Sequence, residues 1–211
     1  MGNWVTALES EAPDIVGAWR GVEAEQFLSV RREVRRRAGP GSATGILAQL
    51  DALLAAIVGL VDTFPDDAFA LPGGEADWNV AQTVGHIATS RAGLALAAGL
   101  AASGRWPPGA PTVIPGVPGP IVDKDELIRK LVQSQRIVAR AAAQVAGHED
   151  EPCPLDHPLV GRLRCGEWLL FAGVHDLMHI EQLHAIAAGL APDEARDEPR
   201  NEAAPVGESP R

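Results

Sequence analysis

The chain has 211 residues, of which 46% are hydrophobic and 22% are charged, and this balance is that of an ordinary globular protein with one domain. A formal net charge of −10 argues against a nucleic-acid partner, because the overall field repels phosphates. Two cysteines, Cys153 and Cys165, are too few for a disulfide scaffold and fit a reducing compartment.

The N-terminus and the apolar segments predict a cytoplasmic protein. The first residues lack the basic start and apolar run of a secretory signal. The longest uncharged apolar-rich stretch, residues 92–104, is too short to cross a bilayer. We therefore expect no membrane partner.

Residues 1–41 predict an N-terminal extension that is partly helical. Its apolar residues fall at helical spacing, with gaps: Ile15, Trp19, Val22, Val30 and Val34. The run 31–37 contains five arginines and precedes Gly39-Pro40. Arginines complement the negative end of a helix, and no groove-reading motif accompanies them, so we interpret the run as a helix C-terminus.

Four long helices are predicted after this extension. The first covers 42–63, where leucine, isoleucine and valine recur at helical spacing. The second begins at a capping residue, Asp77 or Asn79, and ends near Ser103. The third runs from Asp123 to about residue 147, and the fourth from Cys165 to about residue 190. With no strand pattern between them, they predict an all-α four-helix bundle over 42–190.

Two irregular segments and a tail complete the chain. Residues 104–120 contain six prolines and four glycines and predict a long loop. Residues 148–164 form a second irregular segment. The last residues, 191–211, are rich in Pro, Glu, Asp and Arg, and they predict a disordered acidic tail.

The fourth helix carries two histidines on one face. His175 and His179 are four residues apart, hence about 40° apart around the helix axis. Aromatic, polar and aliphatic residues share this face: Trp168, Phe171, Gln182 and Ile186. We interpret it as an inward face, where one metal ion can satisfy both imidazoles. His184 is nine residues from His175 and falls on the opposite side, so we exclude it.

A divalent ion wants a third protein ligand. His86 is the one histidine of the second predicted helix. Its face also carries Asn79, Gln82, Thr83 and Ser90. That face is either the solvent side of the helix or the polar lining of a pocket, and periodicity alone leaves both interpretations open.

Two motifs resemble the DinB/YfiT-like superfamily. The segment 78–88, from Trp78 to His86 and beyond, is similar to the start of that family's second helix. The segments 157–161, 167–168 and 175–182 are similar to its final part. The resemblance covers roughly residues 42–190. It implies an up-down-down-up four-helix bundle with a three-histidine metal site, in which His86, His175 and His179 are the ligands. The arginine-rich start, proline-rich loop and acidic tail depart from the family pattern.

Three neutral imidazoles leave an ion its full charge and an open position. Such an ion lowers the pKa of a bound water or thiol. We expect Zn or Ni, with Fe or Mn as alternatives, and histidine ligands alone do not choose among these metals. Around the metal we expect Gln182, which can orient an imidazole, whereas Asp176, about 100° away on the helix, should be solvated. Further pocket candidates are Trp168, Phe171, Gln82, His157 and Trp106.

Three functions follow from this site. The resemblance implies a transferase or isomerase that uses a small thiol, because the family includes thiol S-transferases and mycothiol-dependent maleylpyruvate isomerase. The loop 104–120, with Trp106, would then cover the pocket. A metal-dependent hydrolase is the second hypothesis. The third is a non-catalytic, stress-associated bundle with a structural metal, whose role is binding or homodimer formation. Small molecules are the expected partners of the first two.

Other site types have little support. The phosphate-loop, dinucleotide-binding and serine-hydrolase motifs are absent from the sequence. A zinc site built from Cys153, His157 and Cys165 matches no known ligand spacing, so we interpret these residues as parts of a loop.

Overall fold

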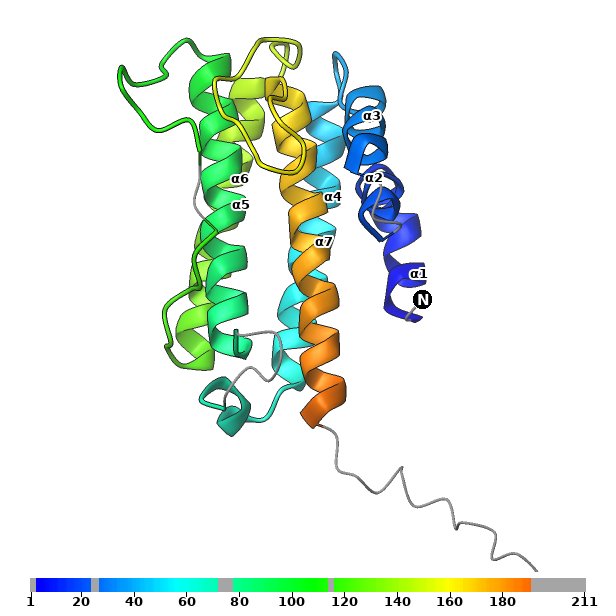
Figure 1. Ribbon diagram of the computed structural model, residues 1–211, viewed down its shortest axis with the longest axis vertical. Helices are drawn as coiled ribbons and strands as arrows, with labels where there is room; N and C mark the ends of the chain where they lie inside the picture. Colours follow the sequence, from blue (N-terminus) through cyan, green and yellow to red (C-terminus); the bar gives the residue numbers. More distant parts are fainter. Residues whose placement is uncertain (1–2, 24–26, 72–77, 114–115, 191–211) are drawn as a thin grey trace, which may run out of the picture.

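The computed structural model describes residues 3–23, 27–71, 78–113 and 116–190. They form an all-α bundle (Figure 1). The four long helices are α4 (Ala43–Thr63), α5 (Val80–Ala102), α6 (Lys124–Val145) and α7 (Cys165–Leu190). The shorter elements are α1 (Asn3–Glu11), α2 (Pro13–Glu23), α3 (Phe27–Arg37) and the 3₁₀ turn η1 (Asp66–Phe69). The predicted acidic tail, 191–211, lies outside the described residues.

The four long helices have the direction pattern that the resemblance implies. Figure 1 shows α4 and α7 running one way and α5 and α6 running the other way. Since α5 and α6 are parallel, the chain between them must return along the bundle. The described parts of the segment between Ala102 and Lys124, residues 103–113 and 116–123, lie along α5 on this return. The proline-rich loop is therefore placed beside the helix that carries His86.

Local caps determine where two of the long helices, α5 and α6, begin. Asn79 accepts a hydrogen bond from the Gln82 backbone N–H, while the Gln82 side chain accepts one from the Asn79 backbone. This reciprocal capping box starts α5. Asp123 caps α6, because its side chain accepts a hydrogen bond from the Glu126 backbone N–H. The other cap predicted for α5, Asp77, lies outside the described residues.

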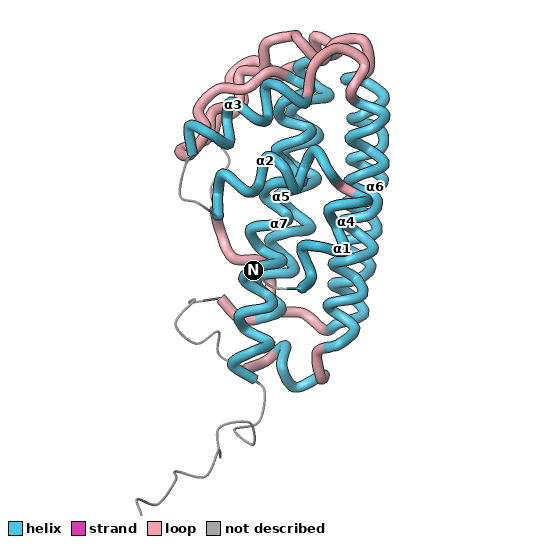
Figure 2. The backbone as a smooth tube through the Cα atoms, turned by 90° about the vertical axis from the view of Figure 1, so that its right-hand side faces the viewer, coloured by secondary structure: helices cyan, strands magenta, loops and turns pink. Residues whose placement is uncertain are grey.

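The described part of the N-terminal segment is helical over most of its length. It forms three helices, which pack against the outer side of α7 and α4 (Figure 2). Ile15, Trp19, Val30 and Val34 are buried in the same hydrophobic core as the long helices. The first helices therefore extend the core of the bundle.

The arginine run ends α3, as predicted, and its side chains have partners inside the molecule. Arg36 pairs with Glu33 at 2.7 Å, and Arg37 pairs with Asp14 at 3.0 Å. Arg35 lies 3.6 Å from Glu167 in the first turn of α7. The pairs made by Arg37 and Arg35 join α3 to α2 and α7.

Among the described residues, one helix, α4, is long and apolar enough to cross a membrane by length and composition. Its mean hydropathy is 2.0 over the most apolar window, of which 33% is buried. A core helix of a water-soluble bundle passes the same test. Here Asp51 lies in the middle of α4 and accepts a hydrogen bond from Gln135 of α6 at 2.6 Å.

Candidate metal centre

Three histidines from two helices meet between α5 and α7. His86 comes from α5, and His175 and His179 come from successive turns of α7. Their ligand nitrogens all lie within 4.8 Å of one another. The Nε2 atoms of His86 and His175 are 3.4 Å apart. The structure thus brings together the three residues that the sequence and the resemblance singled out.

The backbone of the proline-rich loop holds the His86 side chain in place. The His86 Nδ1–H donates to the Val117 carbonyl at 2.7 Å, so the proton is on Nδ1 and the Nε2 lone pair faces the cluster. Two glycines allow this close approach. A Cβ on Gly119 would lie 2.5 Å from the backbone of Gly85, and the Gly119 N–H donates to the Gln82 carbonyl at 2.9 Å. Sequence reasoning missed Val117, because a backbone carbonyl leaves no signature in residue type.

The predicted orienting residue of α7 lies beside the cluster. The His179 Nδ1 is 2.9 Å from the Gln182 amide oxygen. Since that oxygen can only accept, Nδ1 carries the proton and Nε2 is free to bind a metal. The Nδ1 of His175 is buried and has no hydrogen-bond partner among the described residues. The cluster therefore contains an unsatisfied polar atom.

An aromatic ring covers one side of the cluster. The Trp78 indole is stacked on the His179 imidazole, with ring centroids 6.0 Å apart and planes 14° apart. It also contacts the His86 ring at a centroid distance of 4.8 Å. We did not predict Trp78 as a site residue. Its place directly before the α5 cap, within the segment that carries the resemblance, was the signal that could have identified it.

All three imidazoles are held in the neutral form. Burial lowers the pKa of His86 and lowers that of His175 well below its usual value, where His179 and His86 add a further lowering. Burial also lowers the pKa of His179 to about 4. A neutral imidazole is the form that binds a metal ion, so no proton has to leave these rings at pH 7.

A cavity of about 180 Å³ opens beside the cluster. Its walls come from α5, the proline-rich loop, the segment before α7, and α7: His86, Ser90, Leu94, Gly116, His157, Pro158, Leu159 and His175. His157 was a predicted pocket residue and lies in this wall. Its ring contacts Phe171 edge-on at 5.1 Å and Trp168 at 6.4 Å. Trp168 and Phe171, the two predicted aromatic residues, therefore pack against His157. In the described part of the chain, neither ring makes a ring contact with any of the three histidines of the cluster.

Two other predicted pocket residues have different roles. Gln82 is engaged in the capping box of α5. Trp106 is partly buried against the hydrophobic core, and within the described ranges it does not line the cavity of about 180 Å³. The loop does cover His86, through Val117 and Gly116. Cys153 and Cys165 are buried free cysteines outside the histidine cluster.

The prediction that Asp176 is solvated was wrong. Asp176 is completely buried, and its carboxylate lies 3.4 Å from the Arg91 guanidinium of α5, which is also completely buried. Desolvation raises the pKa of Asp176 to about 6, although Arg91 acts in the opposite direction. The prediction assumed that a position off the histidine face meets water. That assumption fails for the first part of α7, because other helices cover it on all sides.

The histidines fit a divalent metal ion. Two nitrogens bound at about 2.1 Å to one tetrahedral ion are about 3.4 Å apart, and the Nε2 atoms of His86 and His175 have this separation. The neutral rings agree with such an ion. So do the hydrogen bonds of the His86 and His179 Nδ1–H groups to Val117 and Gln182, which leave both Nε2 atoms without a proton. The described residues contribute three ligands to this cluster, which leaves a coordination position for an outside group.

A family model described as the DinB superfamily matches residues 49–183, more than half of the chain. The chain belongs to the DinB superfamily. The match begins within α4 and ends within α7, and it includes all three histidines. No curated protein and no solved structure matches the chain. The superfamily assignment therefore establishes the bundle, and the geometry of this DinB protein has to support any finer function.

Proposed function

We propose that this DinB protein holds one divalent metal ion with His86, His175 and His179 and uses it, in the cytoplasm, to transfer or isomerise a small molecule by means of a small thiol. Zn²⁺ and Ni²⁺ suit three imidazoles best, and Fe²⁺ and Mn²⁺ are also compatible. When bound, the ion lowers the pKa of a thiol at its open position, so that a thiolate nucleophile is available at pH 7.

The observation that carries this proposal is the cavity beside the cluster. A structural metal site is closed by four protein ligands, whereas a catalytic site keeps one position open. Here the cluster has three ligands among the described residues, and two of them line a cavity of about 180 Å³. This arrangement favours a reacting group over a purely structural metal.

The walls of the cavity favour an organic ligand over water alone. Leu94, Pro158 and Leu159 are apolar and face the same cavity as His86 and His175. Apolar walls can bury the carbon chain of a thiol or of its partner substrate. A hydrolase that uses metal-bound water is the alternative, and it would need no thiol for turnover.

His157 supplies a further polar group on the wall of the same cavity. Its Nδ1 accepts the Leu159 backbone N–H at 3.2 Å, so the neutral ring carries its proton on Nε2. Burial lowers the pKa of His157 and keeps the ring neutral, although Asp156 opposes this effect. The residue can therefore donate a hydrogen bond to an oxygen that gains negative charge in the cavity.

Metal binding is tested by elemental analysis of the purified, metal-replete protein. We expect one equivalent of a divalent metal in the wild type and a large loss in His179→Ala. His184→Ala is the matched control, because it removes a histidine of the same helix that lies outside the cluster. Metal content that survives His179→Ala, or a wild type with no metal under replete conditions, would contradict the metal site.

The reaction class is tested with a panel of low-molecular-weight thiols, mycothiol among them. Saturable thermal stabilisation by one thiol, together with its conjugation to an electrophile, supports thiol transfer. Both effects should disappear in His179→Ala and persist in His184→Ala. Ester or amide cleavage that needs no thiol would overturn the thiol proposal in favour of the hydrolase.

A further inference from the structure

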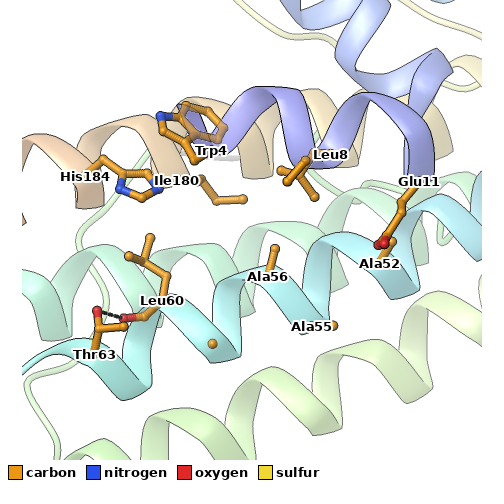
Figure 3. Close-up of a pocket in the computed structure, with 12 residues that line it drawn as sticks. Trp4, Leu8, Glu11, Ala52, Ala55, Ala56, Leu60, Thr63, Ile180 and His184 are labelled. Atoms are coloured by element: carbon orange, nitrogen blue, oxygen red, sulfur yellow. Dashed lines mark hydrogen bonds between the residues drawn. The ribbon is translucent and has the colours of Figure 1, made fainter. Parts of the chain in front are cut away.

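A second and larger cavity lies between α1, α4 and α7 (Figure 3). Its volume is about 400 Å³, against about 180 Å³ beside the histidines. It shares no lining residue with the metal pocket. Twelve residues line this groove: Trp4, Ala7, Leu8, Glu11, Ala52, Ala55, Ala56, Gly59, Leu60, Thr63, Ile180 and His184.

The groove exists because α4 presents small side chains opposite α1. Ala52, Ala55, Ala56 and Gly59 form its floor, and a Cβ added to Gly59 would meet nothing within 4 Å. The floor follows α4 from Ala52 to Thr63, about 16 Å at the rise of an α-helix. The shape therefore suits an elongated molecule, and the volume is within the range of small-molecule sites.

The charged groups of the groove favour a cation. Among the described residues, its lining includes one carboxylate, that of Glu11, and neither lysine nor arginine. Glu11 is the last residue of α1, where the helix carbonyls add negative potential. Within the described part of the chain Glu11 has no ion-pair partner, since Arg20 is paired with Glu9 and Arg37 with Asp14.

The opposite end of the groove is aromatic and uncharged. Trp4 and His184 are stacked there, with ring centroids 5.1 Å apart and planes 19° apart. Burial lowers the pKa of His184, so its ring is neutral near pH 7. Figure 3 shows this pair at one end and Glu11 at the other, with apolar side chains between them. The groove is thus apolar along its length and negative at one end.

We propose that this groove binds an elongated apolar molecule with a single cationic head, of the alkylamine or alkylammonium class. The alkyl chain lies between α1 and α4, and the head lies at Glu11. An alkyl carboxylate of the same length is disfavoured, because its head would meet Glu11 in a protein whose net charge is already −10. The groove is distinct from the metal site and does not depend on the function proposed for it.

The test is calorimetric titration of the metal-replete protein with decyltrimethylammonium and, for comparison, decanoate, both below their micelle concentrations. We expect saturable binding of the cation and an affinity for decanoate that is about tenfold lower. Gly59→Leu fills the floor of the groove and should abolish binding of both. Glu11→Gln should weaken cation binding about two- to fivefold, the size expected of one exposed charge pair, and should strengthen decanoate binding.

Two control variants separate this site from the rest of the molecule. Asp125→Asn removes an exposed carboxylate from α6, which contributes nothing to the groove, and should leave the affinity for the cation unchanged. His179→Ala should also leave it unchanged, since His179 is not part of the lining. Equal or preferred binding of decanoate, or cation binding that survives Gly59→Leu, would overturn the proposal. So would a wild-type dimer in sedimentation that Gly59→Leu converts to monomer, because a second copy would then occupy the groove.

Discussion

The helices α5 and α7 meet at two neighbouring levels, and the two levels are built in opposite ways. At one level His86 faces His175, with 3.4 Å between their Nε2 atoms. At the other level Arg91 faces Asp176, and the distance from the Arg91 Nη1 to the Asp176 Oδ2 is also 3.4 Å. The histidine level consists of neutral rings beside a cavity. The Arg91–Asp176 level has two opposite charges with no exposed side-chain surface.

The two levels differ in the elements that they connect. The Arg91 guanidinium also donates to the Leu50 carbonyl of α4 at 3.1 Å and to Gln135 of α6 at 2.5 Å. The charged level therefore links all four long helices within the chain. The histidine level is held by α5, α7 and the proline-rich loop, and in our proposal a metal ion joins its three rings. The first should govern folding stability, and the second should govern metal affinity.

The largest expected effect comes from breaking the buried charge pair. Arg91→Met leaves the Asp176 carboxylate buried without its counterion and should lower the free energy of unfolding by about 3–5 kcal/mol. Urea denaturation measures this change. The double variant Arg91→Met/Asp176→Leu removes both charges and should recover most of the loss. A loss below about 1 kcal/mol in the single variant would show that the pair does not act as a buried one.

The second effect is a pH dependence in which the two levels have opposite signs. The pKa of His179 is lowered from 6.5 to about 4 in the folded protein, so the unfolded chain binds more protons between these values. The stability of the metal-free protein should therefore rise with pH from 4 to 6.5, by about 3 kcal/mol for a group of this kind. His86 and His175, whose pKa values are also lowered, act in the same direction.

Asp176 opposes that rise. Its pKa is raised from 3.8 to about 6 in the folded protein, so its contribution to stability is present below pH 4 and is lost as the pH rises through 6. Asp176→Asn removes this opposing group, and the rise of stability between pH 4 and 6.5 should become steeper. Chemical denaturation of the chelator-treated protein at several pH values provides the measurement. A wild-type stability that falls over this window would contradict the burial of the three imidazoles.

The smallest expected effect is a change in metal affinity at the histidine level. Gln182→Leu removes the acceptor of the His179 Nδ1–H and should lower metal affinity about 10- to 100-fold, the usual cost of losing an orienting partner. Competition with a chromophoric chelator measures it. Gln133→Leu, on the exposed face of α6, is the control. Equal affinities in the two variants would mean that Gln182 does not orient the ligand.

The positions of the long helices could be predicted because their signals are local. The capping residues Asn79 and Asp123 lie next to the helices they start, and apolar spacing identifies α4 and α7. The N-terminal helices gave a weaker pattern, since they are short and bury only a few residues each. Their contribution to the core depends on α7 and α4 being present beside them.

The sequence by itself determined that His175 and His179 share a face of α7 and that His184 does not, because the period of an α-helix sets these angles. With the resemblance it also identified His86. Only the tertiary structure decided which neighbour covers each face. It buried Asp176 against Arg91, placed the Val117 carbonyl on His86 and stacked Trp78 on His179. These contacts join residues from different elements, and helical periodicity contains no information about the partner across a gap.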